Sequence, residues 1–464
     1  QDFRAHKRMF ETAIEFGDCT LALSSLKGMK NATENCDQKE LSKKNVEFER
    51  ILEITGSSED EISGSKEDVL ISELAIKKII KISRKERFRR PSIGKHRVAH
   101  VSSSLGRGGA ERQLSIGLAG LKKAKNISSI SLFTYKHPNE EVTYAPEIRN
   151  EGIEIIHYGT SLGWKEEFSS KSLGDYSDLI SLLPPRFQRD LIPLSRAFIK
   201  YKPTIVHTWQ DETNIIAGLA ALIARVPVVV MFGRSMRPDE KTMLHIRNRQ
   251  YLRGAYTALL EDKRFTLCLN SVQGMKSYQE WLDFEDGELR VVFNGIDLES
   301  IINNENEQEV EEFLSIKNIN GKKIVGGIFR FVKEKRLELW IDSAKKTIDE
   351  RDDVVFIAVG DGNEREKAIA LVEGTRYEEK ILFPGSTNAV SSWLKKFDLF
   401  ILTSVVEGLP NVLIEAQSFG VPVLSTRAGG AEDTFINLGS GVLLTDEEPE
   451  QIANSISLCL DDFS

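Results

Sequence analysis

The sequence predicts an α/β fold in which two doubly wound, Rossmann-like domains follow each other behind a helical N-terminal region. Three observations predict it. Short apolar runs alternate with helical stretches from Val98 onward, and a second series of the same kind starts at Lys323. The chain before the first series shows helical spacing only. Such alternation is typical of parallel sheets with helices on both faces. We therefore expect three parts, residues 1–92, 93–305 and 306–464, with a ligand cleft between the last two.

The N-terminal part, residues 1–92, is expected to be helical because its apolar residues recur at helical spacing, with Ser- and Glu-rich spacers between them. A basic run begins at Lys77 and ends before Pro91. It is either a solvated helix face and linker or, over residues 77–97, a patch that contacts an anionic membrane surface or acceptor. These helices are also expected to bind a partner or another part of a longer chain.

The strands of the two α/β parts are expected where the apolar runs lie. In the first part these runs are residues 98–101, 130–133, 153–156, 205–207, 228–231, 266–269 and 291–293, with a helix over residues 111–121. In the second part they are residues 323–325, 354–357, 381–383, 399–402 and 421–424. The acidic, Asn-rich stretch 303–307 is the expected junction.

The amino-acid composition excludes several classes of protein. Hydrophobic residues make up 41% and charged residues 28%, as in globular chains with sizeable cores. The net charge of -8 argues against a nucleic-acid-binding protein. The four cysteines lack metal-ligand spacing, which fits a reducing compartment. No apolar stretch reaches the roughly 18 residues of a membrane span, and the start lacks a signal-peptide core, so we expect a cytoplasmic protein that at most contacts the inner membrane face. Because the chain starts without Met, we expect it to be part of a longer one.

The most informative segment runs from Glu407 to Glu415, between two apolar runs. A strand, a Gly-Pro turn and a helix start follow one another, so two carboxylates come at the carboxyl end of a strand, where open α/β sheets bind ligands. A helix that starts at Pro410 leaves the N–H groups of Asn411 and Val412 available to an anion. Carboxylates accept hydrogen bonds from hydroxyls, and a sugar nucleotide combines phosphate with many hydroxyls. The alternative is a capped helix with one buried and one solvated Glu.

Two other loops offer phosphate-binding chemistry. In the glycine-rich turn 104–112, Gly108 and Gly109 let the backbone approach a diphosphate before a helix N-terminus. After the strand at 323–325, Arg330 supplies a planar fork and Lys335 a point charge for a diphosphate leaving group. The alternatives are a plain tight turn and solvated loop cations. Residues 359–362 are either a rim of the same site or a plain turn.

Together these segments resemble the retaining GT-B glycosyltransferases of the large group 1 family, also called family 4. The matching positions are residues 108–111, 293–297, 330 with 335, 359–362, 407–415, 416–423 and 429–430, so the resemblance covers about residue 95 to the end. It implies a GT-B fold and a hexosyltransferase-type enzyme (EC 2.4). Such an enzyme moves a sugar from a nucleotide donor, for example a UDP- or GDP-sugar, to a glycan or lipid-linked acceptor in polysaccharide or glycoconjugate synthesis.

The resemblance also implies roles for single residues. Arg330 and Lys335 would bind the donor diphosphate, Glu415 would accept hydrogen bonds from the ribose, and Glu407 would contact the transferred sugar. Further donor contacts would come from Gly108, Gly109, Asn294, Ser386, Gly408, Leu409 and Asn411. The two glycines at 108 and 109 would close onto the diphosphate from the other domain, and the Ser386 loop would lie beside the base. Family members act without a bound metal or other cofactor, so Arg330 and Lys335 are expected to stabilise the departing diphosphate.

The chain departs from the family in the donor-binding domain. Phe329 stands where Gly usually precedes the Arg, Arg336 where Gly often follows the Lys, and Asp433 where Glu is common. Phe329, Trp209 and the Ser386 loop are expected to form pocket walls. The family has a last helix that crosses back onto the first domain, and we expect this sequence to be truncated before it.

The acceptor side is expected in the first domain. Many relatives have a functional His where Trp209 is found, while His207 comes two residues earlier. His207 is either a core histidine at a strand end or part of the acceptor side together with Trp209, Gln210 and Arg234. Two other functions fit the sequence. One is a sugar-nucleotide epimerase on the same fold, which does not usually carry the two-Glu segment, and the other is an inactive, glycosyltransferase-like scaffold that binds through residues 1–92.

Overall fold

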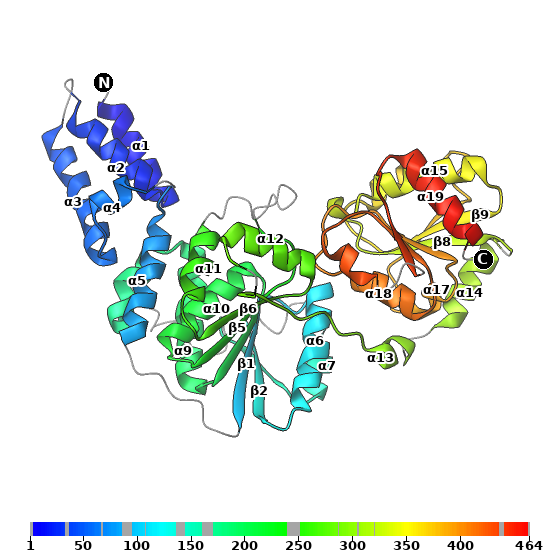
Figure 1. The fold of residues 1–464 in the computed structure, drawn as a ribbon, viewed down its shortest axis with the longest axis horizontal. Coiled ribbons are helices and arrows are strands. Elements are labelled where there is room, and N and C mark those ends of the chain that lie inside the picture. The colour runs from blue at the N-terminus through cyan, green and yellow to red at the C-terminus, as the bar shows by residue number, and fades with distance from the viewer. Residues whose placement is uncertain are drawn as a thin grey trace. The chain divides into compact units, whose positions relative to one another are not determined.

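The computed structural model describes residues 3–32, 37–65, 68–85, 95–106, 108–135, 144–159, 170–238, 251–285, 287–303, 306–319, 321–435 and 440–462. By its contacts the chain divides into two compact units, each of which contains a parallel sheet (Figure 1). Unit 1 comprises Gln1–Gly233 and Asn248–Cys268, and unit 2 comprises Arg234–Arg247 and Leu269–Ser464. The predicted divisions after residues 92 and 305 follow changes in sequence pattern. The contacts instead group the N-terminal helices with the first sheet.

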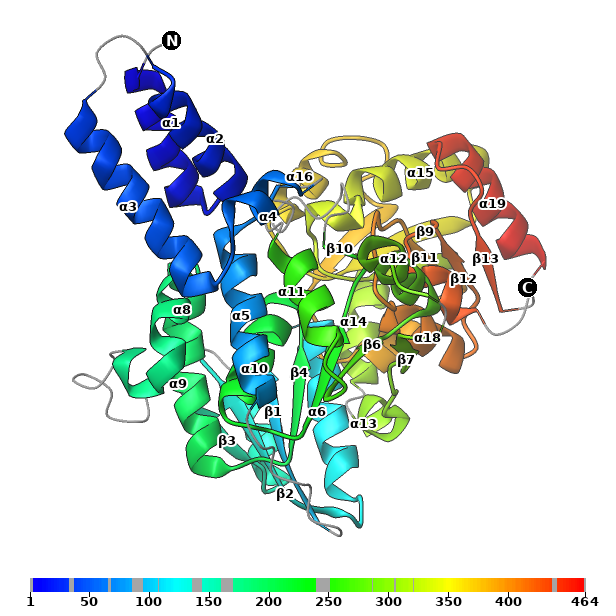
Figure 2. The same cartoon turned by 60° about the vertical axis from the view of Figure 1, so that its left-hand side comes forward.

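Unit 1 begins with a small helical bundle. Its helices are α1 (Phe3–Phe16), α2 (Cys19–Lys30), α3 (Gln38–Thr55), α4 (Glu59–Ser63) and α5 (Ile71–Lys85). Phe10, Phe48 and Leu26 are fully buried in its core. α5 packs against α3 and also against α10 (Asp211–Ile223) and α11 (Tyr251–Leu260), which Figure 2 shows beside it. The helical prediction for the start of the chain is confirmed, whereas the basic run beyond Lys85 lies outside the described residues.

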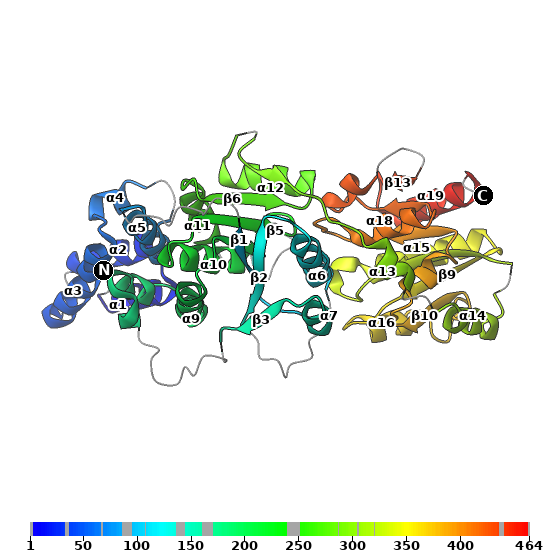
Figure 3. The same ribbon diagram turned by 90° about the horizontal axis from the view of Figure 1, so that it is seen from below.

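The first sheet has the strand order β3-β2-β1-β4-β5-β6-β7. Its strands are β1 (His96–Ser102), β2 (Ile127–Thr134), β3 (Glu154–His157), β4 (Ile205–Trp209), β5 (Val228–Gly233), β6 (Phe265–Leu269) and β7 (Arg290–Val291). The strands from β1 to β5 pair in parallel. The connecting helices are α6 (Gly109–Lys122), α7 (Ala145–Asn150), α8 (Ser177–Ser181), α9 (Pro185–Tyr201), α10 and α11, with η1 (Ser170–Tyr176) before α8 and α12 (Val272–Leu282) after β6. α6 and α7 lie on one face of the sheet, and α9 and α10 on the other (Figure 3).

The second sheet, in unit 2, has the order β10-β9-β8-β11-β12-β13. Its strands are β8 (Lys323–Ile328), β9 (Val354–Val359), β10 (Ile381–Gly385), β11 (Leu399–Leu402), β12 (Val423–Ser425) and β13 (Gly441–Leu443). Unit 2 also contains α13 (Leu298–Asn303), α14 (Glu307–Ile316), η2 (Lys333–Lys335), α15 (Leu337–Glu350), α16 (Arg365–Ala370), α17 (Val390–Leu394), α18 (Asn411–Ser418), η3 (Gly430–Thr434) and α19 (Pro449–Asp462). β9 is buried along its whole length, as its continuous apolar run requires of a central parallel strand. α15 and α19 pack on one face of this sheet and α18 on the other (Figure 1).

The strand predictions are confirmed to within a few residues, and with them the α/β fold of two doubly wound sheets. β13 was missed. It has three residues, all half-buried, and so short an edge strand leaves no apolar run that stands out from a loop.

Each sheet has one point at which the order of strand addition reverses, between β1 and β4 in the first and between β8 and β11 in the second. Ligands of open α/β sheets bind outside the carboxyl ends of the strands at such a point, because the loops there diverge to opposite faces. Gly108 follows β1, Gln210 follows β4, Arg330 and Lys335 follow β8, and Glu407 follows β11. These five predicted site residues therefore stand beside the two switch points.

Candidate active site

Lys335 and Glu407 meet at the switch point of the second sheet. The Lys335 ammonium forms an ion pair with Oε1 of Glu407, and the two side chains are 18% and 14% exposed. The Ser404 hydroxyl donates to the same carboxylate oxygen at 2.6 Å. Because both partners are largely out of water, the pair is screened less than a surface ion pair. A cation and an anion of the predicted site are thus joined to each other.

The backbone of Glu407 is held by the turn after β12. Its N–H donates to the Ala428 carbonyl and its own carbonyl accepts from Gly430 N–H, both at 3.1 Å. The two segments come so close that a Cβ on Gly430 would lie 1.6 Å from the Gly408 carbonyl oxygen. Gly408 is under the same constraint, because its Cβ would lie 2.2 Å from the Arg234 carbonyl oxygen. Glycine at both positions is a requirement of this close backbone approach.

The N-terminus of α18 lies directly after Glu407. The helix starts at Asn411, one residue later than predicted, and no side chain caps it at Pro410. Asn294 braces this end: its amide donates to the Leu409 carbonyl at 3.2 Å and to the Asn411 side-chain oxygen at 2.6 Å. The side-chain oxygen of Asn294 in turn accepts from Arg234 at 2.8 Å. Asn294 and Arg234, predicted on the donor and acceptor sides, are therefore hydrogen-bonded to each other in unit 2.

The other predicted donor residues of unit 2 differ in exposure. Glu415 lies one turn into α18 and is 3% exposed, whereas Arg330 and Ser386 are exposed. Ser386 follows β10, whose last residue Gly385 accepts from Gly360 N–H at 2.8 Å. The loops that bear Arg330 and Ser386 thus both pack against the turn after β9, since Phe331 N–H also donates to the Asp361 carbonyl at 2.9 Å.

Two aromatic residues that were expected to form pocket walls are part of the core. Phe329 is 8% exposed and belongs to the core of unit 2, where its ring contacts Phe331. Trp209 is 7% exposed and packs in unit 1. An aromatic side chain at a strand end can turn either into the core or out of it, and the sequence pattern is the same, so a role of either ring in a pocket wall stays a prediction.

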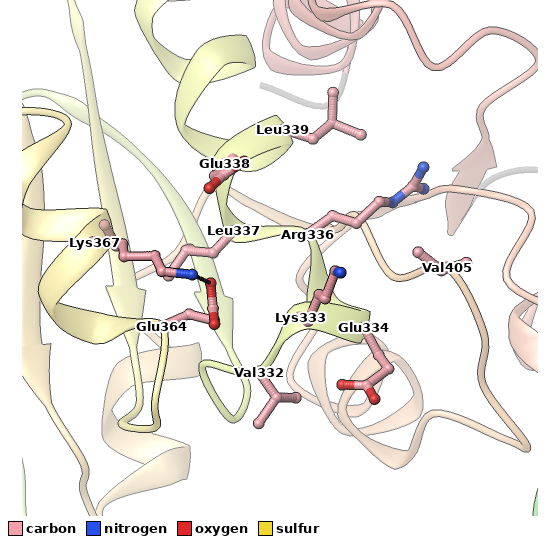
Figure 4. A pocket seen from close by; sticks show the side chains of 11 residues that line it. Val332, Lys333, Glu334, Arg336, Leu337, Glu338, Leu339, Glu364, Lys367 and Val405 are labelled. Atoms are coloured by element: carbon pink, nitrogen blue, oxygen red, sulfur yellow. Dashed lines mark hydrogen bonds and ion pairs between the residues drawn. The ribbon is translucent and has the colours of Figure 1, made fainter. Parts of the chain in front are cut away.

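A pocket of about 670 Å³ adjoins the Lys335 turn (Figure 4). Its lining includes Val332, Leu337 and Val405, the cations Lys333 and Arg336, and the pair Glu364–Lys367, which is bonded at 2.9 Å. Arg330, Lys335, Glu407 and Glu415 are not among the lining residues. The pocket therefore neighbours the predicted donor residues without containing them.

In unit 1 the predicted glycines lie at the start of α6. This helix begins at Gly109 with Gly108 as N-cap and without a side-chain cap. Ser104 donates to Glu111 in the first turn at 2.9 Å, and Ser103 donates to the side-chain oxygen of Gln210 at 2.7 Å. The loops after β1 and β4 are thus joined at the switch point of the first sheet.

His207 belongs to an aromatic cluster at the end of β4. The Trp209 indole N–H donates to its Nε2 at 3.0 Å, and its ring packs edge-on against His100 and Phe232. A nitrogen that accepts a hydrogen bond carries no proton, so this contact fits a neutral His207. The placement is that of a half-buried core histidine.

Burial and then Asp211 raise the pKa of Tyr256 well above its usual value, which keeps this phenol neutral.

The remaining features concern metals, thiols and membranes. Within the described ranges no group of three or more His, Cys, Asp or Glu side chains is arranged to hold a metal ion. Cys19, Cys268 and Cys459 are buried and not disulfide-bonded. Burial, aided by Asp18, raises the pKa of Cys19 to about 12, and burial with Asp462 raises that of Cys459 to about 11. No helix in the described part of the chain combines the length and apolarity that a membrane crossing needs.

Some functional contacts were not foreseen. Ser404, in the same loop as Glu407, donates to its carboxylate, and Arg336 donates to the Ser404 carbonyl. Neither residue type predicts such a contact, and only the departure from the family at position 336 drew attention to Arg336. Asp433, the other departure, accepts a hydrogen bond from Gln273 N–H at 3.0 Å, at the start of α12. At both of these positions, where the chain departs from the family, the side chain thus forms a hydrogen bond to another segment of the chain.

Comparison with known proteins gives the family. A family model described as glycosyl transferases group 1 matches residues 309–463. The chain is 32% identical over 389 residues to the Vi polysaccharide biosynthesis protein VipC/TviE of Salmonella typhi, over 81% of this chain and 67% of that protein. It is 27% identical over 292 residues to the UDP-Gal:alpha-D-GlcNAc-diphosphoundecaprenol alpha-1,3-galactosyltransferase of Escherichia coli, over 59% of this chain and 70% of that protein. These matches favour a transferase over an epimerase or a scaffold.

Solved structures give the fold. Anabaena HepE in complex with UDP and glucose superimposes with a TM-score of 0.60 at 17% identity, over 79% of this chain and 90% of that one. WaaG, a glycosyltransferase involved in lipopolysaccharide biosynthesis, superimposes with a TM-score of 0.53 at 15% identity, over the same shares. Taken with the two switch-point sites, these likenesses show that the chain belongs to the group 1 glycosyltransferases (EC 2.4) and has the GT-B fold.

Proposed function

We propose that this protein is a retaining glycosyltransferase that moves a sugar from a nucleotide-sugar donor to a glycan or lipid-linked acceptor in polysaccharide synthesis. The observation that carries the proposal is the Lys335–Glu407 pair at the switch point of the second sheet, directly before the uncapped N-terminus of α18. A cation and free helix N–H groups suit a diphosphate, and a carboxylate suits sugar hydroxyls. Both are needed for a nucleotide sugar.

The relatives support this substrate class. The Escherichia coli relative is named for a UDP-sugar donor and a diphosphoundecaprenol-linked acceptor, and the Salmonella relative for polysaccharide biosynthesis. HepE was solved with UDP and glucose. A UDP-sugar is therefore the first donor to test, and a polyprenyl-diphosphate-linked sugar the first acceptor.

The first step of the proposed mechanism is a change of the anion that pairs with Lys335. When the donor binds, its diphosphate takes the place of Glu407 as partner of the Lys335 ammonium, and the exposed guanidinium of Arg330 adds a second cation. Charge-assisted hydrogen bonds of this kind contribute about 1.5–3 kcal/mol each. Glu407 then contacts a hydroxyl of the transferred sugar, and Glu415, which is 3% exposed, accepts from the ribose hydroxyls.

The transfer step breaks the bond between the anomeric carbon and the diphosphate oxygen and forms a bond to the acceptor oxygen on the same face. Because the new bond forms on the face that the diphosphate leaves, the configuration is retained. The acceptor proton passes to a phosphate oxygen of the leaving diphosphate, so no separate base is required. Lys335, Arg330 and the α18 N–H groups stabilise the negative charge that develops on the diphosphate. Because these groups are fixed by the fold, we propose that the reaction proceeds without a metal ion.

Peripheral contact with an anionic membrane surface is a second part of the proposal. The described part of the basic run is partly neutralised: Lys77 pairs with Glu73, and Arg84 lies near Glu261 and Asp262. Lys81 and Lys85 are exposed on the same helix. Contact would therefore depend on these two lysines together with the basic residues that follow them.

A screen of nucleotide sugars tests the function. UDP-, GDP-, ADP- and CMP-sugars are added to the protein, and the donor that raises the melting temperature most is then incubated with a polyprenyl-diphosphate-linked sugar. A transferase releases nucleoside diphosphate and lengthens the lipid-linked glycan, with an unchanged rate in EDTA if no metal is required. An epimerase changes the nucleotide sugar without an acceptor, and a scaffold shows neither reaction. The anomeric configuration of the product, measured by NMR, decides whether the transfer is retaining.

A further inference from the structure

Arg336 directly follows the diphosphate cation Lys335, at a position where the family often has Gly. Its backbone lies in the left-handed region, with φ of 49°, where non-glycine residues are uncommon. It is also the N-cap of α15 and does not cap the helix with its side chain. A residue in this region persists only where surrounding contacts hold it there, and the Arg336 side chain makes such contacts.

The guanidinium of Arg336 binds the loop that leads to Glu407. Nε donates to the Thr403 carbonyl at 2.7 Å and Nη2 to the Ser404 carbonyl at 3.1 Å, while Nη1 pairs with Glu447. In Figure 4 the side chain extends from the Lys333 turn toward the side of the pocket where Val405 lies. Two adjacent carbonyls of one loop are thus held by one rigid, planar donor group.

Three further bonds join the same two segments in the reverse direction. The Thr403 hydroxyl donates to the Lys335 carbonyl at 2.9 Å and more weakly to the Arg336 carbonyl at 3.3 Å, and Val405 N–H donates to the Glu334 carbonyl at 2.9 Å. Thr403 and Ser404 are 0% and 1% exposed. The turn that carries Lys335 and the loop that carries Glu407 are therefore joined through two residues, Thr403 and Ser404, that are buried.

Ser404 connects this junction to the carboxylate. Its carbonyl accepts from both Arg336 and the Thr426 hydroxyl, the latter at 2.6 Å, and its own hydroxyl donates to Glu407 at 2.6 Å. Resting on the proposed function, we propose that Arg336 is a positioning residue. It fixes Ser404 so that the Ser404 hydroxyl orients the Glu407 carboxylate toward the transferred sugar.

The experiment compares Arg336→Gly, Ser404→Ala, the double variant and Glu447→Gln. Glycine adopts the left-handed conformation without strain, so Arg336→Gly is expected to fold. Turnover is followed as nucleoside diphosphate released from the nucleotide sugar, and binding as the Kd of the nucleoside diphosphate alone. We expect Arg336→Gly to lower kcat about 10- to 100-fold, because small misplacements of a contact group cost this much, while Kd changes less than about threefold. Glu447→Gln is expected to match the wild type, because its ion pair with Arg336 is partly exposed and contributes little.

The double variant shows whether Arg336 acts through Ser404. If it does, the double variant loses no more activity than the more impaired single variant, since both substitutions remove one chain of contacts. A multiplicative loss, an Arg336→Gly variant with wild-type kcat, or a parallel loss in Kd overturns the inference. Should Arg336→Gly fail to fold, Arg336→Lys replaces it, because one ammonium cannot span both carbonyls as the planar fork does and kcat must still fall. A wild-type protein without any turnover overturns the proposed function instead.

Discussion

The Lys335 ammonium and the Glu407 carboxylate, 72 residues apart in the sequence, form an ion pair beside the N-terminus of α18. The strands that precede these residues, β8 and β11, are neighbours in the sheet although three α-helices, the short η2 and two strands separate them along the chain. The switch point brings the two charges together. We propose this pair as the centre of the diphosphate site, and the predictions below follow from it.

Glu407→Gln keeps the shape of the side chain and its contact with Ser404 but removes the charge. Transfer is expected to fall about 100-fold, since an amide orients a sugar hydroxyl less strongly than a carboxylate does. Initial rates of nucleoside diphosphate release measure the effect. Glu334→Gln is the matched control, because its carboxylate is exposed on the η2 turn. Equal losses in both variants would show that general surface charge, and not Glu407, matters.

Asn294→Ala removes the hydrogen bonds to Leu409, Asn411 and Arg234. We expect a loss of about 1–2 kcal/mol in the free energy of unfolding and a weaker Kd for nucleoside diphosphate, because the start of α18 is no longer braced. Urea denaturation and calorimetry measure the two. Asn294→Asp keeps the size and the acceptor for Arg234 but not the amide donor, so it should not rescue binding; an Asp variant equal to the wild type would contradict the bracing role.

Gly430→Ala places a Cβ 1.6 Å from the Gly408 carbonyl oxygen, so the turn that holds Glu407 must shift. Overpacking of this kind costs about 1–3 kcal/mol, and transfer should fall by about 100-fold. Gly117→Ala in α6 is the control, since nothing lies within 4 Å of its Cβ and Ala is the better helix former. Thermal unfolding should show the control slightly above the wild type and Gly430→Ala below it. A fully active Gly430→Ala would mean that the turn tolerates movement.

Asp262 should make stability depend on acid pH. Burial disfavours its charged form, but hydrogen bonds from Arg264 and the nearby charge of Arg84 outweigh burial and lower the pKa of Asp262. The ionised Asp262 therefore stabilises the fold fully above the pKa of an unfolded Asp, about 3.9. This stabilisation is lost as the pH falls through the lowered pKa of Asp262 in the folded protein. Asp262→Ala should cost about 3 kcal/mol near neutral pH by leaving Arg264 buried without this partner, and less at about pH 3.

The measurement is the urea midpoint of both proteins at the two pH values. Arg84→Ala, at a partly exposed side chain, is expected to cost under about 1 kcal/mol. A difference between wild type and Asp262→Ala that does not change with pH would show that the carboxylate charge is not what holds this junction, in which Arg264 also donates to Ser83 of α5.

The sequence predicted the sheets well because parallel strands are buried on both faces and so appear as apolar runs. It also placed Arg330, Lys335 and Glu407 at strand ends, from which their approach follows once the strand order is known. The strand order itself, and therefore the Lys335–Glu407 contact, is a property of the whole fold and has no local signature.

The directions of the side chains were the main feature that the sequence did not predict. Phe329 and Trp209 follow or end strands as pocket residues do, yet both turn into a core. The bond between Arg234 and Asn294 joins residues 60 positions apart, and no local pattern marks either of them. The contacts of Arg336 and Ser404 were equally unpredictable from the sequence, because a loop Arg and a loop Ser are usually solvated.

Calorimetric binding of a nucleoside diphosphate to Lys335→Ala tests the central claim most directly. Lys333→Ala, two residues away and exposed, is the matched control. UDP and GDP are titrated into each variant and into the wild type. We predict that Kd for the preferred nucleotide rises about 10- to 100-fold in Lys335→Ala and less than about twofold in Lys333→Ala, as expected for the loss of one charge-assisted hydrogen bond. Wild-type affinity in Lys335→Ala would contradict the assignment of the Lys335–Glu407 pair as the diphosphate site.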